Sequence, residues 1–206
     1  MGLPQTNPAY SLDDYLAQER EEEFRHEYLD GQAYAMAGET LEHSTICANI
    51  AGELHAQLKG KSCRTLSPNM KVLSGKYSPG QTKGLFSYPD VSVVCGEPKF
   101  HDERRDVLLN PTLIVEVLSP GTELFDRGEK FHRYRTCLES LQDYVLVSTD
   151  APMVELFQRQ AGGFWLYSAA TGLDARVALP SIACELSLAD IYERLEFASE
   201  EMSGPA

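Results

Sequence analysis

The sequence predicts an α/β fold of the α+β kind, with a mixed central sheet flanked by helices. Helical and extended patterns alternate in the order helix, hairpin, helix, strands, helix, strands, helix. Two segments, Pro89–Cys95 and Thr112–Leu118, are short, rich in β-branched residues and bounded by prolines. These features are typical of the buried central strands of such a sheet.

The N-terminal part predicts a helix followed by a hairpin. The helix should span Ser11–Glu23, because S-L-D-D supplies an N-cap serine and acidic residues in the first turn. Extended segments at Phe24–Leu29 and Gln32–Met36 flank Asp30-Gly31. An Asp-Gly pair between two such segments is a strong hairpin signal, so the added N-terminal unit is a helix plus a hairpin.

A second helix is predicted over Thr40–Lys59, with Gly60 as the residue that ends it. One face of this helix is apolar at every fourth position, namely Ile46, Ile50, Leu54 and Leu58. Cys63–Leu66 and Asn69–Leu73 then predict strands, and residues 74–87, rich in Gly, Ser and Lys, predict a loop.

The second half predicts one long helix among strands. After a polar loop or short helix at Gly96–Asn110, a helix should cover Asp126–Glu139, with Asp126 as its N-cap. The later segments are four strands and a last helix: Tyr144–Ser148, Met153–Gln158, Phe164–Ser168, Arg176–Leu179 and Ser187–Leu195. We expect a single domain over residues 1–206, with its core at about 15–195.

Composition excludes several classes of protein. The chain has 206 residues and no apolar run of membrane-spanning length, and its start has no secretory pattern. The five cysteines form no C-x-x-C pair and their spacing predicts no zinc site, so we expect reduced thiols in a cytoplasmic protein. Cys47, Cys95 and Cys137 lie in apolar patterns and are expected in the core.

The net charge of −13 disfavours a nucleic-acid partner, but the charge is uneven. Residues 13–30 are strongly acidic, whereas no carboxylate occurs between Glu53 and Asp90. That interval carries the basic residues Lys59, Lys61, Arg64, Lys71, Lys76 and Lys83. It could face a phosphate backbone, or it could be an ordinary solvated surface.

Asp90 and Glu116 are the informative pair. Each is a lone carboxylate inside an otherwise apolar predicted strand. A buried carboxylate without a partner costs several kcal/mol or takes up a proton. Two such groups on neighbouring strands would suit Mg²⁺ or Mn²⁺, which carboxylates bind and which can activate water for phosphodiester hydrolysis. Alternatively, each acid meets its own Lys or Arg.

Pro89-Asp90 and Glu116-Val117-Leu118 resemble the P-D…(D/E)-x-K signature of the PD-(D/E)XK, restriction-endonuclease-like nuclease superfamily. Further strings resemble one branch of it, the Uma-type putative restriction endonuclease family, long catalogued as a domain of unknown function. These strings are L-D-G at 29–31, N-M-K-V at 69–72, Y-P-D-V at 88–91, I-V-E-V-L-S-P at 114–120, D-Y-V-L-V at 143–147 and the spacing Asp126…Lys130…Tyr134. The resemblance covers about residues 15–195 and implies a restriction-endonuclease-like core.

The sequence departs from the superfamily signature at Leu118, where a lysine is usual. The Uma-type branch shares this gap, and the resemblance implies that the lysine has moved to the following helix. Lys130 is the best candidate, and Tyr134, four residues later, lies on the same helix face. The alternative is a surface lysine paired with Glu129 or Asp126.

Other candidates have weaker support. Lys71 alternates with Met70 and Val72, so it could reach the site or contact DNA. His43 begins the second helix, where the family has a histidine, and could lie beside the metal. Glu42 and Glu53 on the same helix could add a carboxylate.

The function that the resemblance implies is a metal-dependent endonuclease acting on DNA, with Asp90 and Glu116 as metal ligands and Lys130 and Tyr134 assisting. We expect a homodimer and no membrane association. The alternative is a catalytically degenerate nuclease fold that binds nucleic acid or regulates, which Leu118 and the acidic net charge favour. A third option is the same chemistry on RNA.

Overall fold

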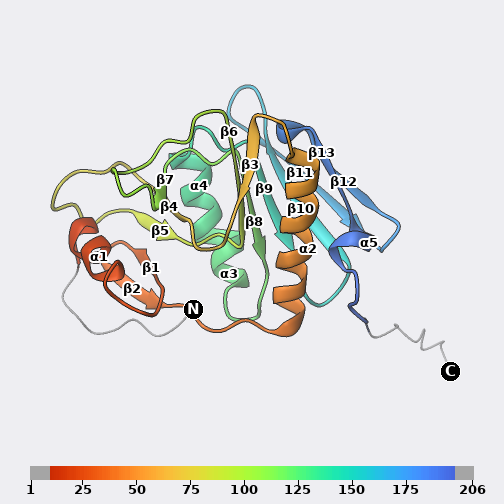
Figure 1. Ribbon diagram of the computed structural model, residues 1–206, viewed down its shortest axis with the longest axis horizontal. Coiled ribbons are helices and arrows are strands. Elements are labelled where there is room, and N and C mark those ends of the chain that lie inside the picture. The colour runs from red at the N-terminus through yellow and green to blue at the C-terminus, as the bar shows by residue number, and fades with distance from the viewer. Residues whose placement is uncertain (1–9, 198–206) are drawn as a thin grey trace.

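The computed structural model describes residues 10–197, which form a central six-stranded sheet covered on both faces (Figure 1). Its strand order is β11-β10-β9-β8-β6-β3, in which β8 and β9 are parallel and all other neighbours are antiparallel. The strands are β3 (Cys63–Leu66), β6 (Val91–Cys95), β8 (Leu113–Val117), β9 (Asp143–Val147), β10 (Met153–Arg159) and β11 (Trp165–Thr171). The predicted mixed central sheet is confirmed.

A second, five-stranded sheet and helix α4 (Phe131–Cys137) cover one face of the central sheet. The order of this second sheet is β2-β1-β5-β4-β7. Its strands are β1 (His26–Leu29), β2 (Gln32–Ala35), β4 (Lys71–Ser74), β5 (Leu85–Ser87) and β7 (Val107–Leu108). Leu85 of this sheet, Ile114 of the central sheet and Tyr134 of α4 share one buried cluster, so the layers are joined by apolar packing.

The other face carries helix α2 (Leu41–Leu58) and a small C-terminal unit. That unit comprises β12 (Arg176–Leu179), the 3₁₀ turn η2 (Pro180–Ile182), β13 (Cys184–Ser187) and α5 (Leu188–Ile191). The predicted apolar face of α2 is buried against the central sheet at all four positions. Within residues 10–197, no helix combines the length and hydrophobicity that a membrane span needs.

The N-terminal elements follow their local signals. Helix α1 (Leu12–Glu19) is capped by Ser11, whose Oγ accepts a hydrogen bond of 3.1 Å from the Asp14 amide. The helix ends four residues earlier than predicted. The β1–β2 hairpin turns at Asp30 and Gly31, with φ of 46° and 95°. Positive φ at both turn residues is what an Asp-Gly hairpin allows.

Short elements were harder to predict. Strand β5 lies inside the predicted loop at 74–87, and it is buried between β1 and β4. Strand β13 was not predicted, and the last helix is only the four residues of α5. Elements of three or four residues are held by their partners in the sheet, and they carry little periodicity of their own.

The helix after β8 begins earlier than predicted and is irregular. It starts with α3 (Glu123–Phe125), passes through one π-helical turn, η1 (Asp126–Lys130), and continues as α4. The prediction that Asp126 is an N-cap is wrong, because Asp126 lies inside this helix and is buried. π turns are rare and occur frequently at functional sites.

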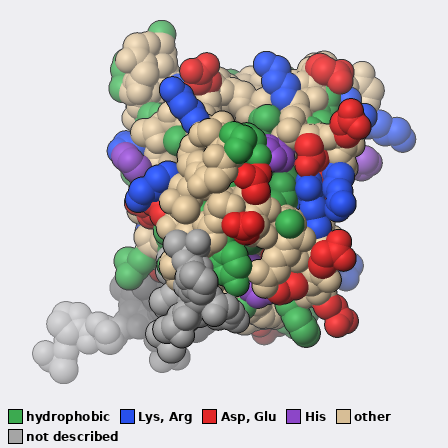
Figure 2. Space-filling view, turned by 90° about the vertical axis from the view of Figure 1, so that its left-hand side faces the viewer, with side chains coloured by type: hydrophobic (Ala, Val, Ile, Leu, Met, Phe, Trp, Pro, Cys, Tyr) green, Lys and Arg blue, Asp and Glu red, His purple; other side chains and the backbone are tan. Residues whose placement is uncertain are grey.

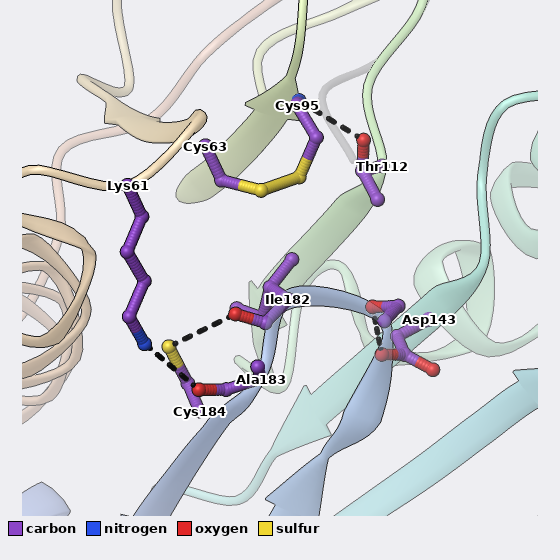
Figure 3. Close-up of a disulfide and its surroundings, with 9 residues drawn as sticks. Lys61, Cys63, Cys95, Thr112, Asp143, Ile182, Ala183 and Cys184 are labelled. Carbon is purple, nitrogen blue, oxygen red and sulfur yellow. Dashed lines mark hydrogen bonds between the residues drawn. A yellow bond between two sulfur atoms is a disulfide. The ribbon is translucent and has the colours of Figure 1, made fainter.

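Two of the five cysteines form a disulfide bond, so the expectation of reduced thiols throughout is wrong. Cys63 on β3 and Cys95 on β6 are direct partners in an antiparallel pair, with their Cα atoms 3.9 Å apart (Figure 3). The backbone amide of Cys95 also donates to Thr112 Oγ1 at 3.1 Å. Cys137, expected in the core, is exposed. The register of β3 against β6 brings the two cysteines together, and the cysteine spacing does not reveal this register.

Candidate active site

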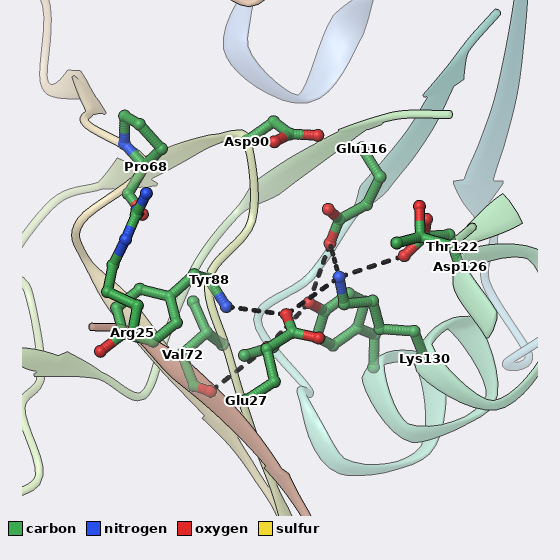
Figure 4. Close-up of polar contacts among 12 residues, drawn as sticks. Arg25, Glu27, Pro68, Val72, Tyr88, Asp90, Glu116, Thr122, Asp126 and Lys130 are labelled. Atoms are coloured by element: carbon green, nitrogen blue, oxygen red, sulfur yellow. Dashed lines mark hydrogen bonds and ion pairs between the residues drawn. The ribbon is translucent and has the colours of Figure 1, made fainter. Parts of the chain in front are cut away.

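Strands β6 and β8 bring Asp90 and Glu116 together. Val91 pairs with Val115, and the same antiparallel register continued by one residue places Asp90 opposite Glu116. Directly opposed residues point to the same face of a sheet, with Cβ atoms about 5 Å apart. Figure 4 shows both carboxylates on adjacent segments, above the helix that carries Lys130.

Glu116 is the buried member of this pair. Its side chain is 3% exposed, and its Oε1 lies 3.0 Å from the Tyr134 hydroxyl and 3.3 Å from Lys130 Nζ. The Tyr134 hydroxyl is also 2.9 Å from Ser87 Oγ, so it can donate to Glu116 and accept from the serine. Burial raises the pKa of Glu116 well above its ordinary value, although the Lys130 ammonium works in the opposite direction.

Lys130 lies at the centre of a carboxylate cluster. Its Nζ is 3.1 Å from Glu27 Oε1, 3.1 Å from Asp126 Oδ1 and 3.3 Å from Glu116 Oε1 (Figure 4). Burial opposes the charge of this lysine, but the three carboxylates together raise the pKa of Lys130 well above its ordinary value. The two directions are compatible, because Glu116 can hold a proton while the lysine stays charged.

The irregular helix supplies two members of this cluster. Asp126 and Lys130 are the first and last residues of the π turn, and both are buried. Asp126 Oδ1 makes no hydrogen bond of good geometry within the described part of the chain, despite its closeness to the ammonium. This buried oxygen therefore contacts the Lys130 ammonium without a well-aligned hydrogen bond.

Glu27 was missed by the sequence analysis, which counted it only within the acidic N-terminal segment. It lies on β1 beside Tyr28, whose ring packs on the α1 side of the sheet. Because side chains alternate along a strand, Glu27 points inward, where its Oε1 also accepts from the Tyr88 amide at 3.1 Å. Alternation around Tyr28 is the signal that could have identified Glu27 as pointing to the opposite side from Tyr28, although not its partners.

Asp90 is more open and meets helix α2. Its side chain is 20% exposed, its Oδ2 accepts from the Val117 amide at 2.7 Å, and His43 Nε2 lies 3.5 Å away. Burial disfavours the charged imidazole, yet the hydrogen bond to Asp90 raises the pKa of His43 to about 11. His43 therefore joins the site from the first turn of α2, beside Asp90.

The structure does not bring Lys71 into this cluster. Its Nζ pairs with Asp106 at 3.4 Å and lies 5.3 Å from the centre of the Tyr88 ring. Glu42 is exposed and Glu53 is half-buried on α2, and neither makes an ion pair with a described residue.

The predicted basic residues are spread over the surface. Lys59 follows His43 by 16 residues (59 − 43), which at 1.5 Å per residue places it about 24 Å along the axis of α2. Lys61 Nζ donates to the Ala183 carbonyl at 3.0 Å, and Lys83 pairs with Asp30 at 3.6 Å. On the face shown in Figure 2, basic and acidic side chains are interspersed and form no continuous basic surface. Contacts of Lys59, Lys61, Arg64, Lys76 and Lys83 with DNA stay predictions.

The donors present fit a hard divalent cation. Asp90 and Glu116 offer carboxylate oxygens from opposed positions of neighbouring strands, and oxygen is the ligand atom that Mg²⁺ and Mn²⁺ prefer. Three buried or half-buried carboxylates around Lys130 exceed its single positive charge. Excess buried negative charge is stabilised by a bound cation.

Comparison with known proteins identifies the family of this chain. The chain matches the Uma2 family model, described as "Putative restriction endonuclease", over residues 12–190. It is 35% identical over 192 residues to the uncharacterized protein slr1290 of Synechocystis sp., covering 92% of this chain and 95% of that protein. A second uncharacterized Synechocystis protein, sll1609, is 29% identical over 164 residues, covering 80% of this chain and 89% of its own length.

A solved structure shows the same fold. The crystal structure of a putative nuclease of the DUF820 family from Anabaena variabilis superposes with a TM-score of 0.70 at 20% sequence identity. The match covers 89% of this chain and 97% of that one. Because the family model matches most of the chain and the solved structure has the same fold, the chain belongs to the Uma2 family of restriction-endonuclease-like proteins.

Proposed function

We propose that the protein is a metal-dependent endonuclease that hydrolyses phosphodiester bonds in DNA. The observation that supports the proposal is the opposed placement of Asp90 and Glu116 on neighbouring strands, with Lys130 Nζ 3.3 Å from Glu116. This arrangement has the three charged groups of a P-D…(D/E)-x-K site, although the lysine comes from a helix. The position after Val117 is Leu118, which is buried and cannot supply an ammonium.

Asp90 and Glu116 would hold Mg²⁺ or Mn²⁺. When bound, such an ion polarises a phosphoryl oxygen and lowers the pKa of water. Tyr134 donates to Glu116 and thereby orients the carboxylate. The Val117 amide does the same for Asp90.

Lys130 would act on the substrate phosphate or on the attacking water. An ammonium has three N–H groups, and in this structure three carboxylates surround it. When Glu116 serves the cation, Glu27 and Asp126 still anchor Lys130, and one N–H can turn to a phosphate oxygen. The anchors keep the lysine charged, as stabilisation of a phosphorane-like transition state requires.

Cleavage of plasmid DNA tests the proposal, with Mg²⁺, with Mn²⁺ and with a chelator. Asp90→Asn and Glu116→Gln should each lower the rate more than about 100-fold, because even the outer partners of metal ligands contribute 10–100-fold. Matched controls are Asp143→Asn and Glu155→Gln, which alter buried carboxylates elsewhere in the central sheet. The site assignment fails when Asp90→Asn cleaves as fast as the wild type.

Two further measurements distinguish a DNA endonuclease from a binding module and from an enzyme that cleaves RNA. Calorimetry with Mn²⁺ should show a site that Glu116→Gln removes. Manganese binding without cleavage of DNA or RNA would identify a binding module instead, and cleavage of RNA alone would change the substrate. The proposed homodimer is tested by sedimentation of the full chain.

A further inference from the structure

Three metal-binding groups of different types lie at the N-terminal end of helix α2, two on the helix and one just before its N-cap Thr40. His43 and Cys47 are four residues apart on α2 and so share one face of the helix, and Glu39 reaches His43 from the residue before the N-cap. One ligand atom from each lies within 4.8 Å of the other two. Among the described residues, no other group of three such side chains is so arranged.

We propose that Glu39, His43 and Cys47 bind a thiophilic divalent metal ion such as Zn²⁺, at a second site that adjoins Asp90 through His43. A thiolate and an imidazole select Zn²⁺ or Co²⁺ over Mg²⁺. The cysteine spacing predicted no zinc site, because that criterion considers cysteines in pairs. Here each donor is a different residue type.

The distances fit tetrahedral coordination. With Zn–N near 2.05 Å and Zn–S near 2.3 Å, tetrahedral ligands lie about 3.6 Å apart for N and S, and about 3.3 Å apart for N and O. His43 Nδ1 lies 3.5 Å from Cys47 Sγ and 3.0 Å from Glu39 Oε2. Shifts of a few tenths of an ångström would suffice to admit the ion.

The other nitrogen of His43 is already held. Its Nε2 lies 3.0 Å from the Val117 carbonyl, to which it donates, and this leaves Nδ1 for the metal. Histidine ligands usually donate their second N–H to a carbonyl or carboxylate, which fixes the ring. Glu39 is 54% exposed on its side chain, so the ion can enter from solvent and keep a water as fourth ligand.

Metal binding releases two protons from the ligands. The ion replaces the thiol proton of Cys47 and the proton on His43 Nδ1, and both protons pass to solvent. The bound ion would then anchor His43, which also contacts Asp90. No change of oxidation state is involved.

Co²⁺ titration of the full chain under argon tests this proposal, because a cysteine ligand produces a sulfur-to-cobalt charge-transfer band. We expect one cobalt per chain and stoichiometric displacement by Zn²⁺, but no displacement by excess Mg²⁺. Cys47→Ser should abolish the band. Glu39→Gln changes an exposed side chain and should weaken binding at least tenfold.

Cys137→Ser and Cys184→Ser are the matched controls, because they alter the other two free cysteines and should leave the band unchanged. Asp90→Asn should also keep it, so this test is independent of nuclease activity. A wild-type protein without the band, or a band that persists in Cys47→Ser, would overturn the proposal.

Discussion

Replacing Lys130 with Met tests whether the carboxylate cluster depends on one buried ammonium. Lys130 is 5% exposed and lies within 3.3 Å of Glu27, Asp126 and Glu116. Removing one partner of a buried ion pair costs about 3–5 kcal/mol, because the remaining charges are left uncompensated. For a chain of this size in urea, that loss corresponds to a midpoint lower by roughly 1–2 M.

The direction of the Lys130 pKa shift determines how its contribution to stability changes with pH. The folded-state pKa of Lys130 is raised, so its contribution to stability is fully present below the unfolded value and is lost as pH rises through the folded value. The whole contribution is therefore present at pH 8. In Lys130→Met the carboxylates must take up protons, which is easier at pH 5, so the difference from wild type should shrink there.

Urea unfolding followed by circular dichroism, at pH 5 and pH 8, measures both effects. The control is Lys83→Met, because Lys83 is 78% exposed and its ion pair with Asp30 is 3.6 Å long. Exposed pairs contribute about 0–1 kcal/mol, so this variant should unfold almost as the wild type does. A Lys130→Met protein within about 1 kcal/mol of wild type at pH 8 would refute the reasoning.

Three other expectations can be measured with purified protein. Burial raises the pKa of Glu116, so the contribution of this group to stability is present below its unfolded-state pKa and is lost as pH rises through its folded-state pKa. Urea unfolding of Glu116→Gln should therefore depend less on pH between 5 and 8 than unfolding of the wild type. The Cys63–Cys95 disulfide joins residues 32 positions apart, and its reduction should lower the free energy of unfolding by about 3–4 kcal/mol. Urea unfolding with and without reductant measures this loss, and equal midpoints would contradict the expectation. The pKa of His43, about 11, should fall in Asp90→Asn because the carboxylate that stabilises the imidazolium is removed; an unchanged NMR titration would show that Asp90 is not the cause.

Much of the local structure could be predicted because it depends on neighbouring residues. The four-residue repeat from Ile46 to Leu58 predicted the buried face of α2, and Asp30-Gly31 predicted the hairpin turn. Short strands such as β5 could not be predicted in this way. Their three or four residues are stabilised by pairing with distant strands, which leaves no repeat in the sequence itself.

Some residues of the candidate site could likewise be found from local patterns, whereas others depend on long-range packing. Lone acids in apolar strands identified Asp90 and Glu116, and the four-residue spacing of Lys130 and Tyr134 predicted that both would reach one place. Glu27 could not be placed beside them, because its position depends on how β1 packs over the central sheet. The π turn that buries Asp126 was likewise invisible to helix-capping rules.

By itself, the sequence determined the longer helices and strands, the apolar face of α2 and the position of two carboxylates beside or within apolar strands, since each follows from residues a few positions apart. Only the tertiary structure decided which side chains meet: Glu27 with Lys130, Cys63 with Cys95, and His43 with Asp90. These contacts join residues that are between 32 and 103 positions apart, as differences of their residue numbers show (95 − 63 and 130 − 27). Register and layer packing bring such residues together, and both are properties of the assembled core.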